Sequence, residues 1–170
     1  MTEYKTCAIT GHRFASLPFG SNENDERCRR LKTVIRSKLT ALIETEDVAN
    51  FLCGMALGSD QIVCEILIQL KFLYPHIRLI AYMPCREQYL RWSAAQIARY
   101  RYLLLHADEI IQTTEQYSKG CMHLRNHAMV DAADFLLAVH RKGTRGGTAS
   151  TVAYAKKRNL PIVEIDPANV

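Results

Sequence analysis

Short apolar runs alternate with longer amphipathic segments along the whole chain. The apolar runs are bounded by glycine, proline or polar residues, which is typical of buried strands. We expect strands at residues 5–10, 48–53, 77–83, 109–113, 135–139 and 162–165. Between these runs, apolar residues recur at helical spacing. We expect helices after a Ser21 or Asn22 cap, from Ser59 or Asp60, and over residues 87–106, 121–132 and 148–158.

The alternation of strands with helices predicts the general architecture. Such an order favours βαβ units, in which parallel strands form a central sheet covered by helices on both faces. No linker, repeat or low-complexity stretch interrupts the order, so residues 1–170 are expected to form a single domain. We therefore expect a three-layer α/β domain with a mostly parallel sheet of about five to six strands.

Glycine loops follow the first, second and fifth predicted strands. Gly11 lies in the first loop, and residues 54–58 and 143–147 form the other two. Because the carboxyl ends of parallel strands share one edge of the sheet, these loops should converge on one ligand site. Gly146 and Gly147 would let the backbone approach a phosphate, and Thr148 would both cap the next helix and donate to a phosphate oxygen. The alternative is a plain turn that needs glycine for its geometry.

Three motifs, in the right order, resemble the SLOG superfamily and, within it, the YpsA-like branch. They are TGHR at residues 10–13, GMALGSD at residues 54–60, and MHLRNHAMVD at residues 122–131 followed by a Gly-Gly-Thr loop. The superfamily includes the LOG-type phosphoribohydrolases and the DprA-type DNA-processing proteins. The resemblance implies a single Rossmann-like three-layer domain, a small-molecule nucleotide ligand, and a homodimer or larger homo-oligomer.

The same resemblance leaves catalysis open. In LOG-type enzymes the last loop reads PGGxGTxxE and its glutamate is catalytic, whereas Thr151 takes that place here. The family's catalytic arginine corresponds to Arg125, and the lysine beside it to Asn126. Cleavage of an N-glycosidic bond needs carboxylates, so a hydrolase would have to use Asp60 or Glu65. Asp60 is equally well explained as part of a helix cap.

The expected ligand contacts lie in the same loops. Arg125 would clamp a phosphate or orient a ribose, and Asn126 would read a base or a hydroxyl. His12 offers either an anion contact or a neutral hydrogen bond within a turn. The full set of expected binding residues is Gly11, His12, Arg13, Gly54, Gly58, Ser59, Asn126, Gly146, Gly147 and Thr148.

Composition and charge narrow the function classes. The net charge of +5 is moderate, and the basic runs at 27–32 and 156–158 lie on predicted helices as solvated faces, so nucleic acid is not the expected partner. The six cysteines contain no CxxC pair and indicate reduced thiols in a cytoplasmic protein. No apolar run has the length of a membrane span. From the N-terminal residues we expect no export signal. His123 and His127 have a zinc-like spacing but no evident third ligand, so we expect no metal and no cofactor.

We therefore expect a protein that binds or senses a nucleotide-derived ligand, such as a nucleoside monophosphate or an ADP-ribose-like molecule. Two alternatives stay open. The first is a nucleoside 5′-monophosphate phosphoribohydrolase that cleaves the N-glycosidic bond. The second is DprA-like binding of single-stranded DNA, which would call for a basic groove with interleaved aromatic side chains.

Overall fold

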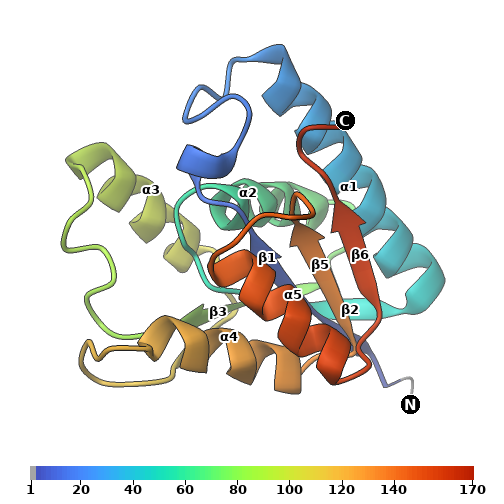
Figure 1. The fold of residues 1–170 in the computed structure, drawn as a ribbon. Coiled ribbons are helices and arrows are strands. Elements are labelled where there is room, and N and C mark those ends of the chain that lie inside the picture. The colour runs from blue at the N-terminus through green and yellow to red at the C-terminus, as the bar shows by residue number, and fades with distance from the viewer. Residues whose placement is uncertain (1–2) are drawn as a thin grey trace.

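The computed structural model describes residues 3–170, which form a six-stranded parallel sheet with the strand order β4-β3-β2-β1-β5-β6 (Figure 1). The strands are β1 (Lys5–Gly11), β2 (Val48–Cys53), β3 (Arg78–Met83), β4 (Glu109–Gln112), β5 (Phe135–Val139) and β6 (Ile162–Ile165). The helices are α1 (Glu26–Glu46), α2 (Ser59–Leu70), α3 (Ala94–Leu105), α4 (Cys121–Asp131) and α5 (Gly147–Lys157), with a short 3-10 helix at Phe14–Ser16. None of the helices in residues 3–170 combines the length and the apolar character needed to cross a membrane.

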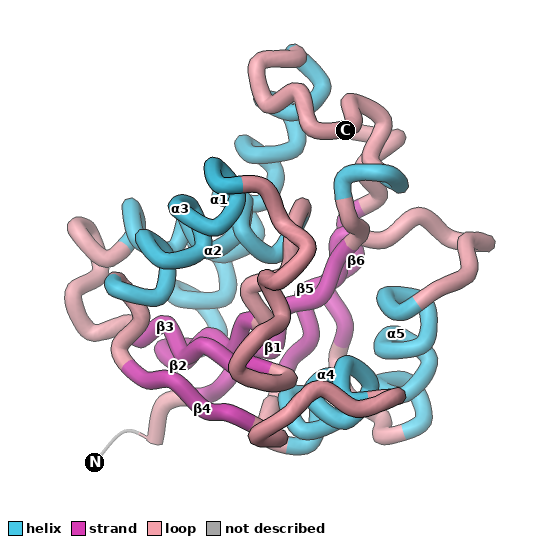
Figure 2. Tube along the Cα trace, turned by 90° about the vertical axis from the view of Figure 1, so that its left-hand side faces the viewer, coloured by secondary structure: helices cyan, strands magenta, loops and turns pink. Residues whose placement is uncertain are grey.

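The helices cover both faces of the sheet, as the sequence predicted. Helices α1, α2 and α3 pack on one face, and α4 and α5 pack on the other (Figure 2). The chain runs outward from β1 to β4, then returns past β1 to form β5 and β6. The strand order therefore reverses between β1 and β5, and in sheets of this kind a crevice forms outside the carboxyl ends of the strands at that point.

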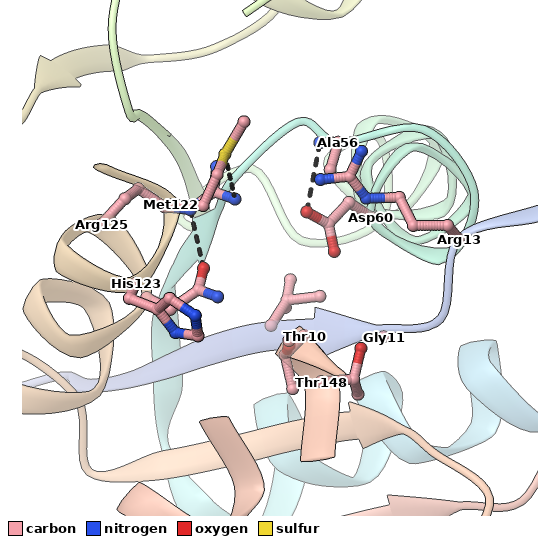
Figure 3. A pocket seen from close by; sticks show the side chains of 12 residues that line it. Thr10, Gly11, Arg13, Ala56, Asp60, Met122, His123, Arg125 and Thr148 are labelled. Carbon is pink, nitrogen blue, oxygen red and sulfur yellow. Dashed lines mark hydrogen bonds between the residues drawn. The ribbon is translucent and has the colours of Figure 1, made fainter. Parts of the chain in front are cut away.

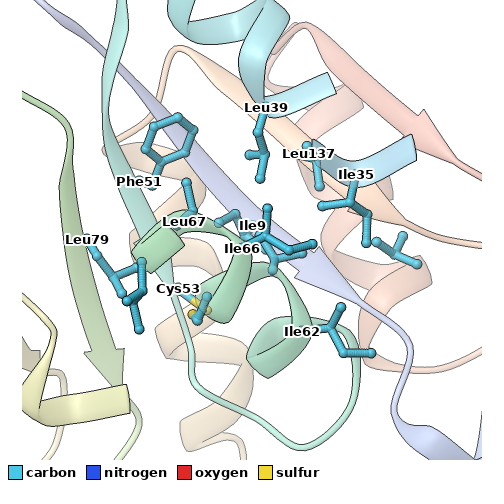
Figure 4. Packing of buried hydrophobic residues seen from close by; sticks show 14 of the residues in the cluster. Ile9, Ile35, Leu39, Phe51, Cys53, Ile62, Ile66, Leu67, Leu79 and Leu137 are labelled. Carbon is cyan, nitrogen blue, oxygen red and sulfur yellow. The ribbon is translucent and has the colours of Figure 1, made fainter. Parts of the chain in front are cut away.

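The larger hydrophobic core lies between the sheet and α1 to α3. Ile35 and Leu39 of α1 pack with Ile9 of β1 and Leu137 of β5, and all four side chains are fully buried (Figure 4). Burying a side chain of this size contributes about 1.5–3 kcal/mol to folding. The strands that carry the first and last glycine loops are thus held by fully buried side chains in this core.

The expected helix over residues 87–106 is wrong in its first half. Helix α3 begins only at Ala94, and the chain before it forms turns. Tyr89 and Trp92 belong to these turns and pack their rings against Tyr100 of the helix, at centroid distances of 5.7 Å and 5.3 Å. The bulky side chains therefore belong to a turn that packs against the helix. Their spacing along the chain is the same as in a longer helix, so the sequence pattern did not distinguish the two.

The first helix also begins later than expected. Its N-cap is Asp25, whose Oδ1 accepts a hydrogen bond of 2.8 Å from the backbone N–H of Arg27. Ser21 and Asn22, the expected caps, lie in the preceding turns. Ser, Asn and Asp are all favourable cap residues, so the sequence alone did not distinguish Asp25 from Ser21 and Asn22. The other element bounds agree closely with the predicted ones.

The start of α3 gives a stability test. Ser93 and Gln96 form a capping box, in which the Ser93 hydroxyl accepts from the Gln96 N–H at 3.2 Å and the Gln96 side chain accepts from the Ser93 N–H at 2.9 Å. Ser93→Ala should lower the free energy of unfolding by about 1 kcal/mol, and Tm by about 2–4 °C, in a thermal melt. Ser118→Ala, at an exposed loop serine, is the control. Equal Tm values for the two variants would contradict a capped helix start at Ser93.

Candidate functional site

A cavity of about 160 Å³ lies at the carboxyl edge of the sheet, where the strand order reverses (Figure 3). Its walls come from the loops after β1 and β2 and from the first turns of α4 and α5. They consist of Ile9, Thr10, Gly11, Arg13, Ala56, Asp60, Met122, His123, Arg125, Asn126, Gly147 and Thr148. Segments far apart in the sequence thus meet at the place where sheets of this kind bind ligands.

The first turn of α5 forms one wall of the cavity and is left open. Gly146, with a φ of 126°, precedes the helix as its N-cap and supplies no side-chain cap. In the described chain the backbone N–H groups of Gly147, Thr148 and Ala149 have no acceptor. Thr148 is a helix residue on the cavity wall, so the expectation that its hydroxyl caps the helix is wrong. Unpaired N–H groups at the positive end of a helix dipole form an anion site.

Arg125 of α4 forms the opposite wall and is only 3% exposed. Its Nη1 donates to the carbonyl oxygens of Gly54 at 2.7 Å and Tyr82 at 3.3 Å, and its Nε donates to Asn126 Oδ1 at 2.7 Å. Its Nη2 reaches only the sulfur of Met122, at 3.7 Å. Burial lowers the pKa of Arg125 and the Asp60 carboxylate opposes this shift, but a guanidinium keeps its charge in proteins. Nη2 therefore meets only a weak sulfur acceptor and can also donate to an oxygen of a ligand.

Two glycines of the second loop serve packing and do not line the cavity. A Cβ atom on Gly54 would lie 2.3 Å from Nη1 of Arg125, and one on Gly58 would lie 2.7 Å from the carbonyl oxygen of His12. Gly58 also has a φ of 97°, which disfavours any other residue. We expected Gly54 and Gly58 to touch a ligand. In the structure they instead allow neighbouring groups to approach closely: the Arg125 side chain at Gly54 and the loop after β1 at Gly58.

Gly11, Ser59 and His12 join the first loop to its neighbours. Gly11 lines the cavity, and a Cβ on it would lie 2.4 Å from Cβ of Ser59. The Ser59 hydroxyl donates to the His12 carbonyl oxygen at 2.8 Å, so it caps no helix and does not reach the cavity. The buried ring of His12 accepts, through Nε2, the backbone N–H of Arg141 at 2.9 Å. His12 is thus a neutral acceptor between two loops and not an anion contact, while the exposed Arg13 lines the cavity.

Asp60 is a buried carboxylate on the cavity wall, only 6% exposed. Its Oδ2 accepts a hydrogen bond of 3.2 Å from the backbone N–H of Ala56, so it turns back toward its own loop and does not cap α2. Burial raises the pKa of Asp60, and the positive charges of Arg125 and Arg13 oppose that rise.

Glu65, the other candidate carboxylate, is not brought to the cavity. Its Oε1 accepts from Nε of Arg99 at 2.8 Å, and Arg99 also binds Glu23 at 2.6 Å. Five residues along a helix rotate a side chain by about 140°, which turns Glu65 away from Asp60 toward α3. Thr151, in the place of the LOG-type glutamate, donates its hydroxyl to the Gly147 carbonyl oxygen at 2.8 Å. Asp60 is therefore the one carboxylate among the residues that line the cavity.

The cavity also contains residues that were not expected as contacts. Thr10 and Ala56 adjoin the glycine motifs, and Met122 precedes Arg125 by three positions, a spacing that places both on one helix face. That spacing would have identified Met122 in advance. His123 lines the cavity, whereas His127 stacks on Tyr154 with ring centroids 3.8 Å apart.

The buried His12 predicts a pH dependence of stability. Burial lowers the pKa of His12 below 6.5, the nearby His140 lowers it further, and Asp166 opposes this. On acidification the unfolded chain takes up its proton first, so the free energy of unfolding should fall as the pH drops through 6.5 toward the lower folded-state pKa. His12→Gln keeps an acceptor for Arg141 but does not titrate, so it should flatten this fall.

Urea unfolding at pH 7.5, 6.5 and 5.5 gives the comparison. His76→Gln removes an exposed histidine and should keep the wild-type slope. A slope of stability against pH that is unchanged in His12→Gln would show that His12 is not the group responsible.

Comparisons with known proteins agree with the family resemblance of the motifs that form the site. The YpsA family model, described as the YspA SLOG family, matches residues 7–169. The chain is 35% identical over 143 residues to the uncharacterized SPbeta prophage-derived protein YoqJ of Bacillus subtilis (strain 168), covering 77% of this chain and 83% of YoqJ. It is 31% identical over 156 residues to a UPF0398 protein of Halalkalibacterium halodurans, covering 91% of this chain and 82% of the relative.

A solved structure shares the fold. DNA processing protein A from Helicobacter pylori, studied for its single-stranded DNA binding mode, matches with a TM-score of 0.61 and 18% identity. The match covers 95% of this chain but 65% of the other, so this chain spans less than two thirds of that protein. At this identity the similarity shows the fold alone, and the expectation that nucleic acid is not a partner stays a prediction. Since the family model matches nearly the whole chain and two relatives exceed 30% identity, the chain belongs to the YpsA family of SLOG proteins.

Proposed function

We propose that this protein binds a nucleotide or a nucleotide-derived ligand, such as a nucleoside monophosphate or an ADP-ribose-like molecule. The ligand's phosphate would lie at the N-terminus of α5. The observation that carries the proposal is the open first turn of this helix. The N–H groups of Gly147 and Thr148 have no acceptor, and both residues line a cavity that is also lined by the buried Arg125.

The charges around the cavity support an anionic group. The helix terminus carries a partial positive charge of about half an elementary charge. Nη2 of Arg125, which meets only the sulfur of Met122, adds a charged donor, and the exposed Arg13 adds another on the cavity wall. A phosphate offers several acceptor oxygens at once and can bond to both walls.

Polar groups beyond the phosphate subsite support a larger ligand. Asn126 uses Oδ1 for Arg125, which leaves its amide N–H₂ free to donate. His123 is exposed on the same wall and offers a ring for stacking or hydrogen bonding. Membership of the SLOG family, together with the fold shared with a DNA-binding protein, agrees with a nucleotide or nucleic-acid ligand.

Ligand-induced stabilisation tests this proposal. AMP, CMP, ADP, ADP-ribose and NAD should be screened by thermal shift, with a short single-stranded DNA beside them. A ligand at 100 times its dissociation constant adds about 2.7 kcal/mol, a rise in Tm of about 5–10 °C at this size. Gly147→Asp should abolish the rise, because it puts a negative charge where the phosphate lies.

The control for that variant is Gly147→Asn, which adds the same volume without the charge. No atom lies within 4 Å of a Cβ built on Gly147, so both variants should fold. Arg125→Lys keeps the charge but loses the planar fork, and should bind more weakly. The proposal fails if no ligand raises Tm, or if Gly147→Asp responds like wild type. Binding of DNA alone, strengthened at low salt, would favour the DprA-like function instead.

A hydrolase is the second candidate, because the buried Asp60 supplies a carboxylate within the cavity. As a base it could activate water at the glycosidic carbon, with Arg125 holding the phosphate or the ribose. Release of free base from AMP or CMP, followed by chromatography, would show turnover. Asp60→Asn should lower that rate at least 100-fold, whereas Glu65→Gln, which changes a residue outside the cavity, should leave it near wild type. Binding without base release would reduce the function to binding or sensing.

A further inference from the structure

Asp60 is the residue that a simple phosphate site does not explain. Its carboxylate lies on the wall of a cavity whose other charged groups are arginines and a helix N-terminus. Oδ2 is held by the N–H of Ala56, but Oδ1 has no hydrogen-bond partner within residues 3–170. Oδ1 is not among the side-chain atoms that are buried without a partner, so it borders the open space of the cavity. This oxygen can therefore accept from a donor that arrives with the ligand.

The surroundings of Asp60 restrict that donor. No arginine or lysine nitrogen of the described chain lies within 4.0 Å of the carboxylate, so no ion pair satisfies it. Burial raises the pKa of Asp60, and the charges of Arg125 and Arg13 favour its ionised form. Figure 3 shows Asp60 and Arg13 on one side of the cavity, with Arg125 and His123 across from them.

Two classes of partner for the Asp60 carboxylate fit this cavity poorly. A metal ion needs several ligands, and across residues 3–170 no group of three His, Cys, Asp or Glu side chains is placed to hold one. A cationic amine would meet the positive charges of Arg125 and Arg13 on the same walls. A neutral donor remains, and a carboxylate has enough free lone pairs to accept two hydroxyl groups.

The position of Asp60 within the cavity identifies the hydroxyls. It shares a cavity of about 160 Å³ with Gly147 and Thr148, whereas about 10–15 Å³ is enough to hold one water molecule. In a nucleotide the ribose is bonded directly to the phosphate, and the base lies further out. Resting on the proposed function, in which the phosphate lies at α5, we propose that Asp60 binds the vicinal 2′- and 3′-hydroxyls of a ribose.

The ligand is therefore a ribonucleotide or another ribose phosphate, and the site selects against deoxyribose. The 2′-hydroxyl is the group by which a protein distinguishes RNA-type from DNA-type ligands. Asp60 is then a specificity-determining residue. The selectivity arises because a deoxyribose offers the Asp60 carboxylate one hydroxyl donor fewer than a ribose does.

Calorimetric titration with matched ligand pairs tests this inference. The pairs are AMP with 2′-deoxy-AMP, and ribose 5-phosphate with 2-deoxyribose 5-phosphate, which lacks any base. Wild-type protein should bind the ribose member of each pair about 10- to 100-fold more tightly. Asp60→Asn keeps an oxygen for the Ala56 N–H but presents an N–H₂ group to the sugar. It should lower affinity for the ribose ligands to that for the deoxyribose ligands.

Glu65→Gln is the matched control, because it neutralises a carboxylate of the same helix that faces Arg99. It should keep the wild-type preference. Equal binding of both members of each pair by wild type would overturn the ribose assignment, and so would a preference retained in Asp60→Asn. The wild-type comparison needs no variant, so it stands even if Asp60→Asn fails to fold. If phosphate-bearing ligands of either kind bind, the nucleotide proposal survives a failed ribose assignment; if none binds, both are overturned.

Discussion

The carboxyl edge of the sheet depends on one buried guanidinium. Arg125 reaches from α4 into a space that exists only because Gly54 lacks a side chain, and it donates to the carbonyls of Gly54 and Tyr82. These bonds tie α4 to the ends of β2 and β3. Because a buried charge is costly unless it is hydrogen-bonded, the helix, the loop and the strand end must keep their relative positions. The walls of the cavity follow from that constraint.

The remaining loops are joined by backbone contacts of the same kind. Ser59 donates to the carbonyl of His12, and the His12 ring accepts from the N–H of Arg141, so loops after β1, β2 and β5 form one connected unit. These contacts satisfy polar groups within the protein and leave the first turn of α5 unsatisfied. The loops are therefore held in place by hydrogen bonds within the protein, while the unpaired N–H groups of Gly147 and Thr148 belong to residues that line the cavity.

Most of the fold was predictable because strand and helix periods are local properties of the chain. The parallel sheet with helices on both faces is confirmed, and the reversal of strand order lies beside the predicted glycine loops. The errors arose where the sequence pattern was compatible with more than one local structure. Tyr89 and Trp92 look like helix residues but pack onto Tyr100 from a turn, and Asp25 rather than Ser21 caps α1. A homodimer and a cytoplasmic location stay predictions.

For the site, the sequence by itself determined which loops meet, because loops that follow parallel strands all lie at the carboxyl edge of the sheet. It also identified Arg125, Asp60, Asn126 and the turn at Gly147 as candidate site residues, because they lie in or beside these loops. Only the tertiary structure decided what each group does there. In the folded protein, Glu65 accepts a hydrogen bond from Arg99, and the His12 ring accepts one from the backbone N–H of Arg141. Oδ2 of Asp60 accepts from Ala56, and its Oδ1 has no partner within residues 3–170. The reason is physical: a polar side chain's role is set by the partners it finds across the fold, and these lie far from it along the chain.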